Sequence, residues 1–134
     1  MKNTVSHNSI HIFSGLRGSI LLLTLITLIG PVAEAQTNYA STSSGNWNTT
    51  TTWSPNGNPG SIDNVNINGG HIINLSANAA CRDLTVNGTL NIGNYTFTLN
   101  NNFNINGGAL VTMGSGMLYF RDDVIGAGGG SFNC

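Results

Sequence analysis

The feature that most constrains the fold is an internal repeat in the second half of the chain. The segment Ile67–Gly69 (Ile-Asn-Gly) recurs as Val86–Gly88 and again as Ile105–Gly107, and each step is 19 residues. Val124 and Gly126 continue the apolar and glycine columns into a fourth copy. A fixed spacing of this kind indicates stacked units that bury their apolar faces against one another.

Further apolar residues keep the same spacing. The sets are Val65, Leu84 and Phe103; Ile73, Ile92 and Val111; and Ala80, Leu99 and Leu118. Apolar and polar residues alternate within each copy, which indicates strands with one face inside and one outside. Gly and Asn separate these stretches, where turns need positive φ.

A unit of 19 residues is too short for two strands joined by a crossover helix, but it suits one coil of about three short strands. We therefore predict an all-β fold, a parallel β-helix or solenoid with 19-residue coils over residues 62–126. Equivalent residues of successive coils would then stack at the ~4.8 Å spacing of neighbouring strands. A small antiparallel β-sandwich is the alternative.

The segments on either side of the repeat differ from it in composition. Residues 36–61 are rich in Ser, Thr and Asn and include Trp47 and Trp53, so we expect them to form a cap or lead-in over the first coil. Residues 127–134 form a Gly-rich tail without a recognisable cap. We interpret the chain as a fragment of a longer protein, or as one whose last coil pairs edge to edge with another copy.

The first 35 residues have the pattern of a secretory signal peptide. Basic residues Lys2 and Arg17 precede an uncharged apolar run over residues 20–29, and Ala33 and Ala35 supply the small residues of a cleavage site. The alternative is an uncleaved membrane anchor, but the run is shorter than the roughly 20 residues that a spanning helix needs. We expect cleavage before Gln36 and an extracellular or cell-surface location.

The charges of residues 36–134 exclude some partners. This part of the chain has no lysine, and Arg82 and Arg121 stand against four aspartates. No basic patch is available to neutralise phosphates, so neither nucleic acid nor a membrane surface is an expected partner. The two cysteines, Cys81 and Cys134, are expected to be unlinked, although an exported protein can form a disulfide.

The sequence offers little catalytic chemistry, and we predict no enzyme, no cofactor and no metal site. His71 is the only histidine after the signal peptide, and Cys81 has no neighbouring base, which favours a structural thiol. Asp83 and Asp123 would lie roughly 12 Å apart on stacked strands. A glycosidase pair needs about 5–9.5 Å.

A regular polar face is the strongest candidate for binding. Its outward positions are Asn64, Asn66, Asn68, Asp83, Thr85, Asn87, Asn102, Asn104 and Asn106. These groups could meet the hydroxyls of an extracellular polysaccharide, or they could simply keep the surface polar while stacked Asn side chains bond to one another. Trp47 and Trp53 form a possible aromatic platform, with Tyr95 and Tyr119 as further stacking candidates. For both tryptophans we expect packing in the core or the cap rather than this platform.

Several motifs carry a resemblance to a known group of proteins. They are Ser44–Trp47, Thr52–Ser54, Pro59, Asp63–Ile67, Gly70–His71, Ala80–Cys81, Leu84–Val86 and Gly88–Leu90. Over roughly residues 39–113 the chain resembles the eight-glycine-domain region of secreted surface repeat proteins from bacteria that use type IX secretion. The resemblance implies a right-handed β-helical module on a secreted or surface protein.

We therefore expect a non-catalytic extracellular β-solenoid module, acting as a structural or adhesive segment. Its expected partners are an extracellular polysaccharide or a surface protein. The alternative is a carbohydrate-binding or polysaccharide-processing β-helix whose catalytic part lies beyond residue 134.

Overall fold

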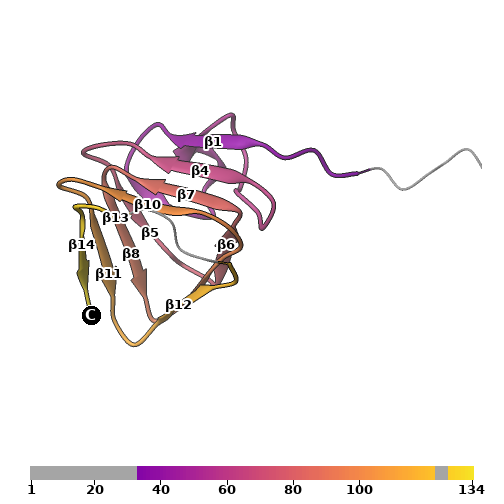
Figure 1. Ribbon diagram of the computed structural model, residues 1–134. Coiled ribbons are helices and arrows are strands. Elements are labelled where there is room, and N and C mark those ends of the chain that lie inside the picture. The colour runs from indigo at the N-terminus through magenta and orange to yellow at the C-terminus, as the bar shows by residue number, and fades with distance from the viewer. Residues whose placement is uncertain (1–32, 123–126) are drawn as a thin grey trace, which may run out of the picture. The chain divides into compact units, whose positions relative to one another are not determined.

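Alternating apolar and polar residues place the chain on three β-sheets that wind around one core. The computed structural model describes residues 33–122 and 127–134, and the part from Gln36 to Cys134 is a β-solenoid of stacked coils (Figure 1). The predicted fold class is therefore confirmed. The signal-peptide residues 1–32 and the predicted positions of Asp123, Val124 and Gly126 lie outside the described residues.

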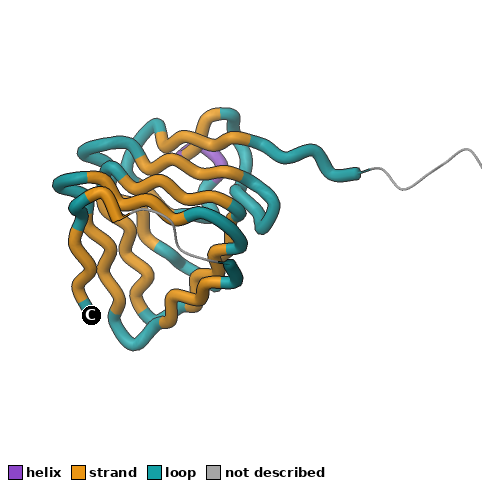
Figure 2. Tube along the Cα trace, in the orientation of Figure 1, coloured by secondary structure: helices purple, strands orange, loops and turns teal. Residues whose placement is uncertain are grey.

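Three coils each contribute one strand to each sheet in turn, and short loops join the three sides (Figure 2). Sheet A contains β1 (Asn38–Ser41), β3 (Trp53–Ser54), β4 (Asn64–Ile67), β7 (Asp83–Val86), β10 (Phe103–Asn106) and β13 (Ala127–Gly128). Sheet B contains β2 (Gly45–Asn46), β5 (Ile72–Asn74), β8 (Thr89–Gly93), β11 (Leu110–Met113) and β14 (Ser131–Asn133). Sheet C contains β6 (Ala79–Cys81), β9 (Thr96–Leu99) and β12 (Met117–Phe120). The three coils run from β4 to β6, from β7 to β9 and from β10 to β12. All strand pairs are parallel except β1 with β3.

The 19-residue spacing describes sheet A between β4 and β10. Val65 pairs with Leu84 and Leu84 with Phe103, as the repeat predicted. Ile67, Val86 and Ile105 form the second column, and each is at most 2% exposed. The side chains between these columns point outward, so the predicted alternation is confirmed on this face.

The predicted columns on the other two sheets are wrong. On sheet B, Leu90 rather than Ile92 lies between Ile73 and Val111. On sheet C, the observed columns are Cys81, Leu99 and Phe120, and beside them Ala79, Phe97 and Leu118. Ala80 pairs with Thr98 and lies on the outer side. A uniform 19-residue coil is thus also wrong.

Turn length explains the shift. Four residues separate β4 from β5, but only Asn87 and Gly88 separate β7 from β8. The short turn runs close above the preceding coil, and a Cβ at Gly88 would lie within 2.5 Å of the carbonyl oxygen of Asn68 and closer still to that of His71. Glycine is required there by close approach of two backbones.

The stack extends beyond residues 62–126. At one end β1 pairs with β4, so part of the expected lead-in forms a coil strand. At the other end Ile105 pairs with Ala127 and Val111 pairs with Phe132, so the Gly-rich tail adds strands to sheets A and B. The step on sheet A from Ile105 to its partner Ala127 is three residues longer than the 19-residue repeat.

The core is filled by inward side chains of all three sheets. Trp47 and Trp53 are 1% and 0% exposed, and their rings meet edge to face at 5.1 Å. Trp47 also contacts Phe97 at 5.0 Å, which connects the segment after β2 to the core behind sheet C. Each indole N–H is satisfied: that of Trp53 donates to the carbonyl of Trp47 at 2.7 Å, and that of Trp47 to the carbonyl of Pro59 at 3.3 Å.

The helical content of the described residues is the single 3-10 turn η1 (Thr50–Thr52). In residues 33–122 and 127–134 no helix is long and apolar enough to cross a membrane.

Candidate ligand-binding surface

The nine residues of the predicted polar face lie together on the outside of sheet A or directly before or after its strands. Asn64 pairs with Asp83, and Asn66 pairs with Thr85, which in turn pairs with Asn104. Eight of the nine are half-buried, and Asn102 is exposed. The sequence therefore located a continuous face, because outward positions of a parallel stack align across the strands.

Side-chain amides on this face bond to one another from coil to coil. Asn106 donates to Oδ1 of Asn87, and Asn87 donates to Oδ1 of Asn66 at 2.7 Å. Asn66 then donates to Asn68 at 3.0 Å, and Asn68 donates to the carbonyl of Ser41 at 2.7 Å. We call this series the amide ladder. An amide that is both donor and acceptor within the ladder has less capacity left for a ligand.

A second, shorter series connects the coils on sheet B. The hydroxyl of Thr112 donates to Oδ1 of Asn91 at 2.6 Å, and Asn91 donates to Oδ1 of Asn74 at 2.7 Å. These three residues occupy one outward column, since Asn74 pairs with Asn91 and Asn91 with Thr112. Side-chain bonds between coils therefore occur on two of the three faces.

Sheet A also has a shallow hollow of about 260 Å³. It is lined by Asn38, Tyr39, Asn64, Val65, Asn66, Asp83 and Thr85. Most of its polar groups already have partners: Asn64 donates to Asn38 at 2.8 Å, and Oδ1 of Asp83 accepts from Asn101 at 2.7 Å. Oδ1 of Asn64 is buried and has no partner among the described residues.

The possible aromatic platform of Trp47 and Trp53 is not formed, and the expected packing of both residues in the core is confirmed. Both rings lie in the core, where they contact each other and Phe97, and neither has a face toward solvent. Their burial follows from their large apolar area, which contributes more inside the coil than on its surface. The exposed aromatic residues Tyr95, Tyr119 and Phe132 are 37%, 53% and 47% exposed.

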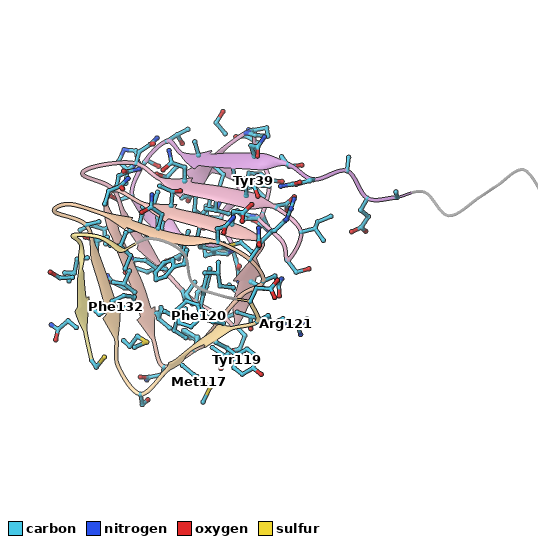
Figure 3. All side chains as sticks on the ribbon, viewed as in Figure 1. Tyr39, Met117, Tyr119, Phe120, Arg121 and Phe132 are labelled. Atoms are coloured by element: carbon cyan, nitrogen blue, oxygen red, sulfur yellow. The ribbon has the colours of Figure 1, made fainter. Side chains whose placement is uncertain are left out.

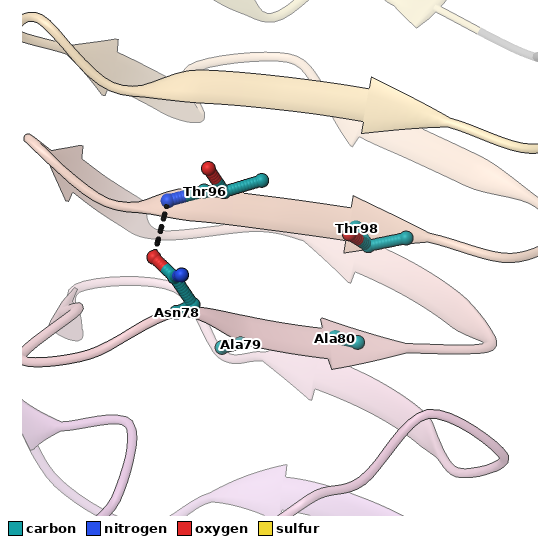
Figure 4. A pocket seen from close by; sticks show the side chains of 5 residues that line it. All are labelled: Asn78, Ala79, Ala80, Thr96 and Thr98. Atoms are coloured by element: carbon teal, nitrogen blue, oxygen red, sulfur yellow. Dashed lines mark hydrogen bonds between the residues drawn. The ribbon is translucent and has the colours of Figure 1, made fainter.

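The outer side of sheet C differs from sheet A and was not identified as a site from the sequence. Its strands carry two outward rows, Asn78, Thr96 and Met117 and then Ala80, Thr98 and Tyr119. Figure 4 shows the strip of this surface over β6 and β9, where a hollow of about 400 Å³ is lined by Asn78, Ala79, Ala80, Thr96 and Thr98. We call this strip the sheet C trough. The available signal was Tyr119, an aromatic residue at an outward position of a predicted strand.

Cys81 is a structural thiol. It is fully buried in a column with Leu99 and Phe120, and burial, together with the nearby Asp83 and Asp63, raises the pKa of its thiol well above the ordinary value. A protonated, enclosed thiol is a poor nucleophile. Cys134 is exposed, and the two cysteines are unlinked.

The remaining titratable groups are dispersed or serve the backbone. His71 Nδ1 lies 2.8 Å from Oγ of Ser41, which is itself buried and accepts from the backbone N–H of Asn68. The carboxylate of Asp63 accepts from the backbone N–H groups of Thr37 and Gly60, each at 2.8 Å. Among the described residues no group of three His, Cys, Asp or Glu side chains is arranged to hold a metal ion.

These features define the class of the molecule as a parallel β-solenoid with polar ladders on two faces and a shallow trough on the third. Comparisons with protein-family models, with curated proteins and with solved structures find no match to this chain.

Proposed function

We propose that this chain is a non-catalytic extracellular β-solenoid module that acts as a structural or adhesive segment of a secreted or cell-surface protein. The amide ladder is the observation that carries the proposal. On the most regular polar face of the molecule, the side-chain amides of Asn106, Asn87 and Asn66 form hydrogen bonds between coils. A surface used in this way stiffens a stack and keeps it soluble, which suits a spacer or a scaffold for adhesion.

Export is supported by the sequence of the N-terminal segment. The basic residues, the apolar run and the Ala33 and Ala35 pair all precede Gln36. The boundary between the two units of the chain falls between Ala35 and Gln36. The backbone N–H of Thr37, the second residue after the expected cleavage site, donates to Asp63 at 2.8 Å and so ties this part of the chain to the solenoid.

The test is expression of the full chain in a Gram-negative bacterium, followed by fractionation and N-terminal sequencing. The proposal predicts protein outside the inner membrane that begins at Gln36. Protein that begins at Met1 and remains in the cytoplasm or inner membrane would contradict it. The exported protein should also release no new reducing ends from a panel of polysaccharides, and release of such ends would contradict the non-catalytic assignment.

A further inference from the structure

The sheet C trough has a geometry suited to a linear ligand. On one strand, two neighbouring outward side chains are separated by a residue that points inward, so the backbone between them is uncovered on the outside. In a parallel stack these uncovered stretches of backbone align from strand to strand. The trough therefore runs from β6 to β9 along the direction in which the coils stack, and β12 adds the exposed Met117 and Tyr119 next to β9, beyond the residues that line the hollow. Every strand adds one rung, at a spacing of ~4.8 Å.

Small residues form the floor at one end, and large residues rise at the other. Ala80 pairs with Thr98, and Thr98 pairs with Tyr119, so the outward row ends in an aromatic ring. In the neighbouring row Thr96 pairs with Met117, which is 58% exposed. Figure 3 shows Met117 and Tyr119 on the outer side of β12, with Phe120 toward the interior.

The groups in the trough are uncharged. The amide of Asn78 accepts a hydrogen bond of 2.9 Å from the backbone N–H of Thr96, which holds the side chain at the trough and leaves its Nδ2 as a donor (Figure 4). Thr96 and Thr98 add hydroxyl groups that can both donate and accept. In contrast to the amides of sheet A, these groups are not part of a ladder between side chains.

From this combination we propose that the sheet C trough binds a neutral, linear polysaccharide. The chain of sugars lies along the stacking direction, one ring packs on Tyr119, and hydroxyls of the preceding sugars meet Thr98 and Asn78. The spacing of the rungs is close to the length of one sugar in an extended chain. An exposed aromatic ring beside uncharged donors and acceptors matches a sugar, which has an apolar face and a polar rim. This inference rests on the proposed adhesive function and names its partner.

The experiment measures binding of cellohexaose and mannohexaose to the exported chain by isothermal titration calorimetry, with hexagalacturonate as an acidic comparison. We expect at least one neutral hexasaccharide to bind and the acidic one to bind more weakly. Tyr119→Ala should weaken that binding about tenfold, the equivalent of ~1.4 kcal/mol. Tyr119→Phe retains the ring and should bind like the parent chain.

Asn104→Ala on sheet A is the matched control and should leave the affinity unchanged. Because Tyr119 is half exposed, its variants should unfold at nearly the parent temperature, which circular dichroism checks. Three results would overturn the inference: no binding of either neutral hexasaccharide at millimolar concentration, preference for the acidic one, or equal binding by Tyr119→Ala. Export and ladder stability are measured separately, so this failure would leave the proposed function standing.

Discussion

The side-chain amide of Asn87 donates a hydrogen bond of 2.7 Å to Oδ1 of Asn66 in the preceding coil, and its own Oδ1 accepts from Asn106 in the next. Asn87 therefore joins three coils through one side chain. The two bonds are half-buried, so water replaces them incompletely when they are lost.

Asn87→Ala should lower the free energy of unfolding by about 1–2 kcal/mol, because two hydrogen bonds between coils disappear. Urea unfolding followed by circular dichroism measures the change. Asn104→Ala is the control, since Asn104 lies on the same face but outside the amide ladder, and it should change stability by less than about 0.5 kcal/mol. Equal effects of the two substitutions would show that the ladder does not stabilise the stack.

The glycines of the repeat separate into two kinds. Gly69 and Gly88 occupy the same position in the 19-residue pattern, yet a Cβ at Gly69 would find its nearest neighbour at 3.8 Å, whereas one at Gly88 would collide with two backbone carbonyls. Gly88→Ala should therefore reduce the thermal unfolding temperature strongly, and Gly69→Ala should be tolerated. A tolerated Gly88→Ala would contradict the short turn between β7 and β8.

Cysteine labelling tests the packing behind sheet C. Under native conditions at neutral pH, a maleimide should label Cys134 and spare Cys81, because burial raises the pKa of the Cys81 thiol. Cys81 should react only after denaturant is added. Labelling of both cysteines in the folded protein at similar rates would contradict this placement.

The same thiol predicts a pH dependence of stability. In the unfolded chain Cys81 loses its proton near the ordinary thiol pKa of 9.0, whereas the folded protein retains it. The contribution of this thiol to the free energy of unfolding is complete below this pH. It declines as the pH rises above it, because the unfolded state then binds fewer protons than the folded state. Cys81→Ala should remove this alkaline decline, which urea unfolding at a series of pH values measures.

Edge-to-edge self-association is a further prediction for residues 36–134. Among the described residues β12, β13 and β14 are the outermost strands of their sheets at the C-terminal end of the stack. Phe132 pairs with the inward Val111 but is 47% exposed, since no described strand covers it. Sedimentation of residues 36–134 over a concentration series should show association. Phe132→Lys should reduce this association. Ile72→Lys, at a similarly exposed site on β5, is the control and should reduce it less. Equal effects of the two substitutions would contradict association through the C-terminal end of the stack.

The sequence predicted the alternation and one face of the stack well, because sheet A keeps the same 19-residue step from β4 to β7 and from β7 to β10. It could not predict the register of the other sheets. Leu90 and Ile92 are both apolar and both fully buried on β8, so either one satisfies a pattern of period two opposite Ile73. Only the length of the turn at Gly88 decides between them, and that length depends on a backbone contact with the preceding coil.

The candidate sites were predicted less well for a related reason. The nine polar residues were placed correctly, but whether an amide bonds to its neighbour or to a ligand depends on the side-chain geometry between coils. The tryptophans were offered as a platform because aromatic residues suit both cores and sugar faces. The sheet C trough became visible only once Ala80, Thr98 and Tyr119 were aligned, and the assumed spacing had placed Ala80 beside Leu99 instead.

The most direct test of the account compares two adjacent substitutions on β7, Val86→Asp and Thr85→Asp. Val86 is fully buried between Ile67 and Ile105, and a charge there should lower the free energy of unfolding by more than about 3 kcal/mol or prevent folding. Thr85 points outward, so its substitution should change stability by less than about 1 kcal/mol. Thermal and urea unfolding of both variants beside the parent chain provide the measurement. The stacked solenoid predicts this large difference, and equal effects at the two positions would contradict it.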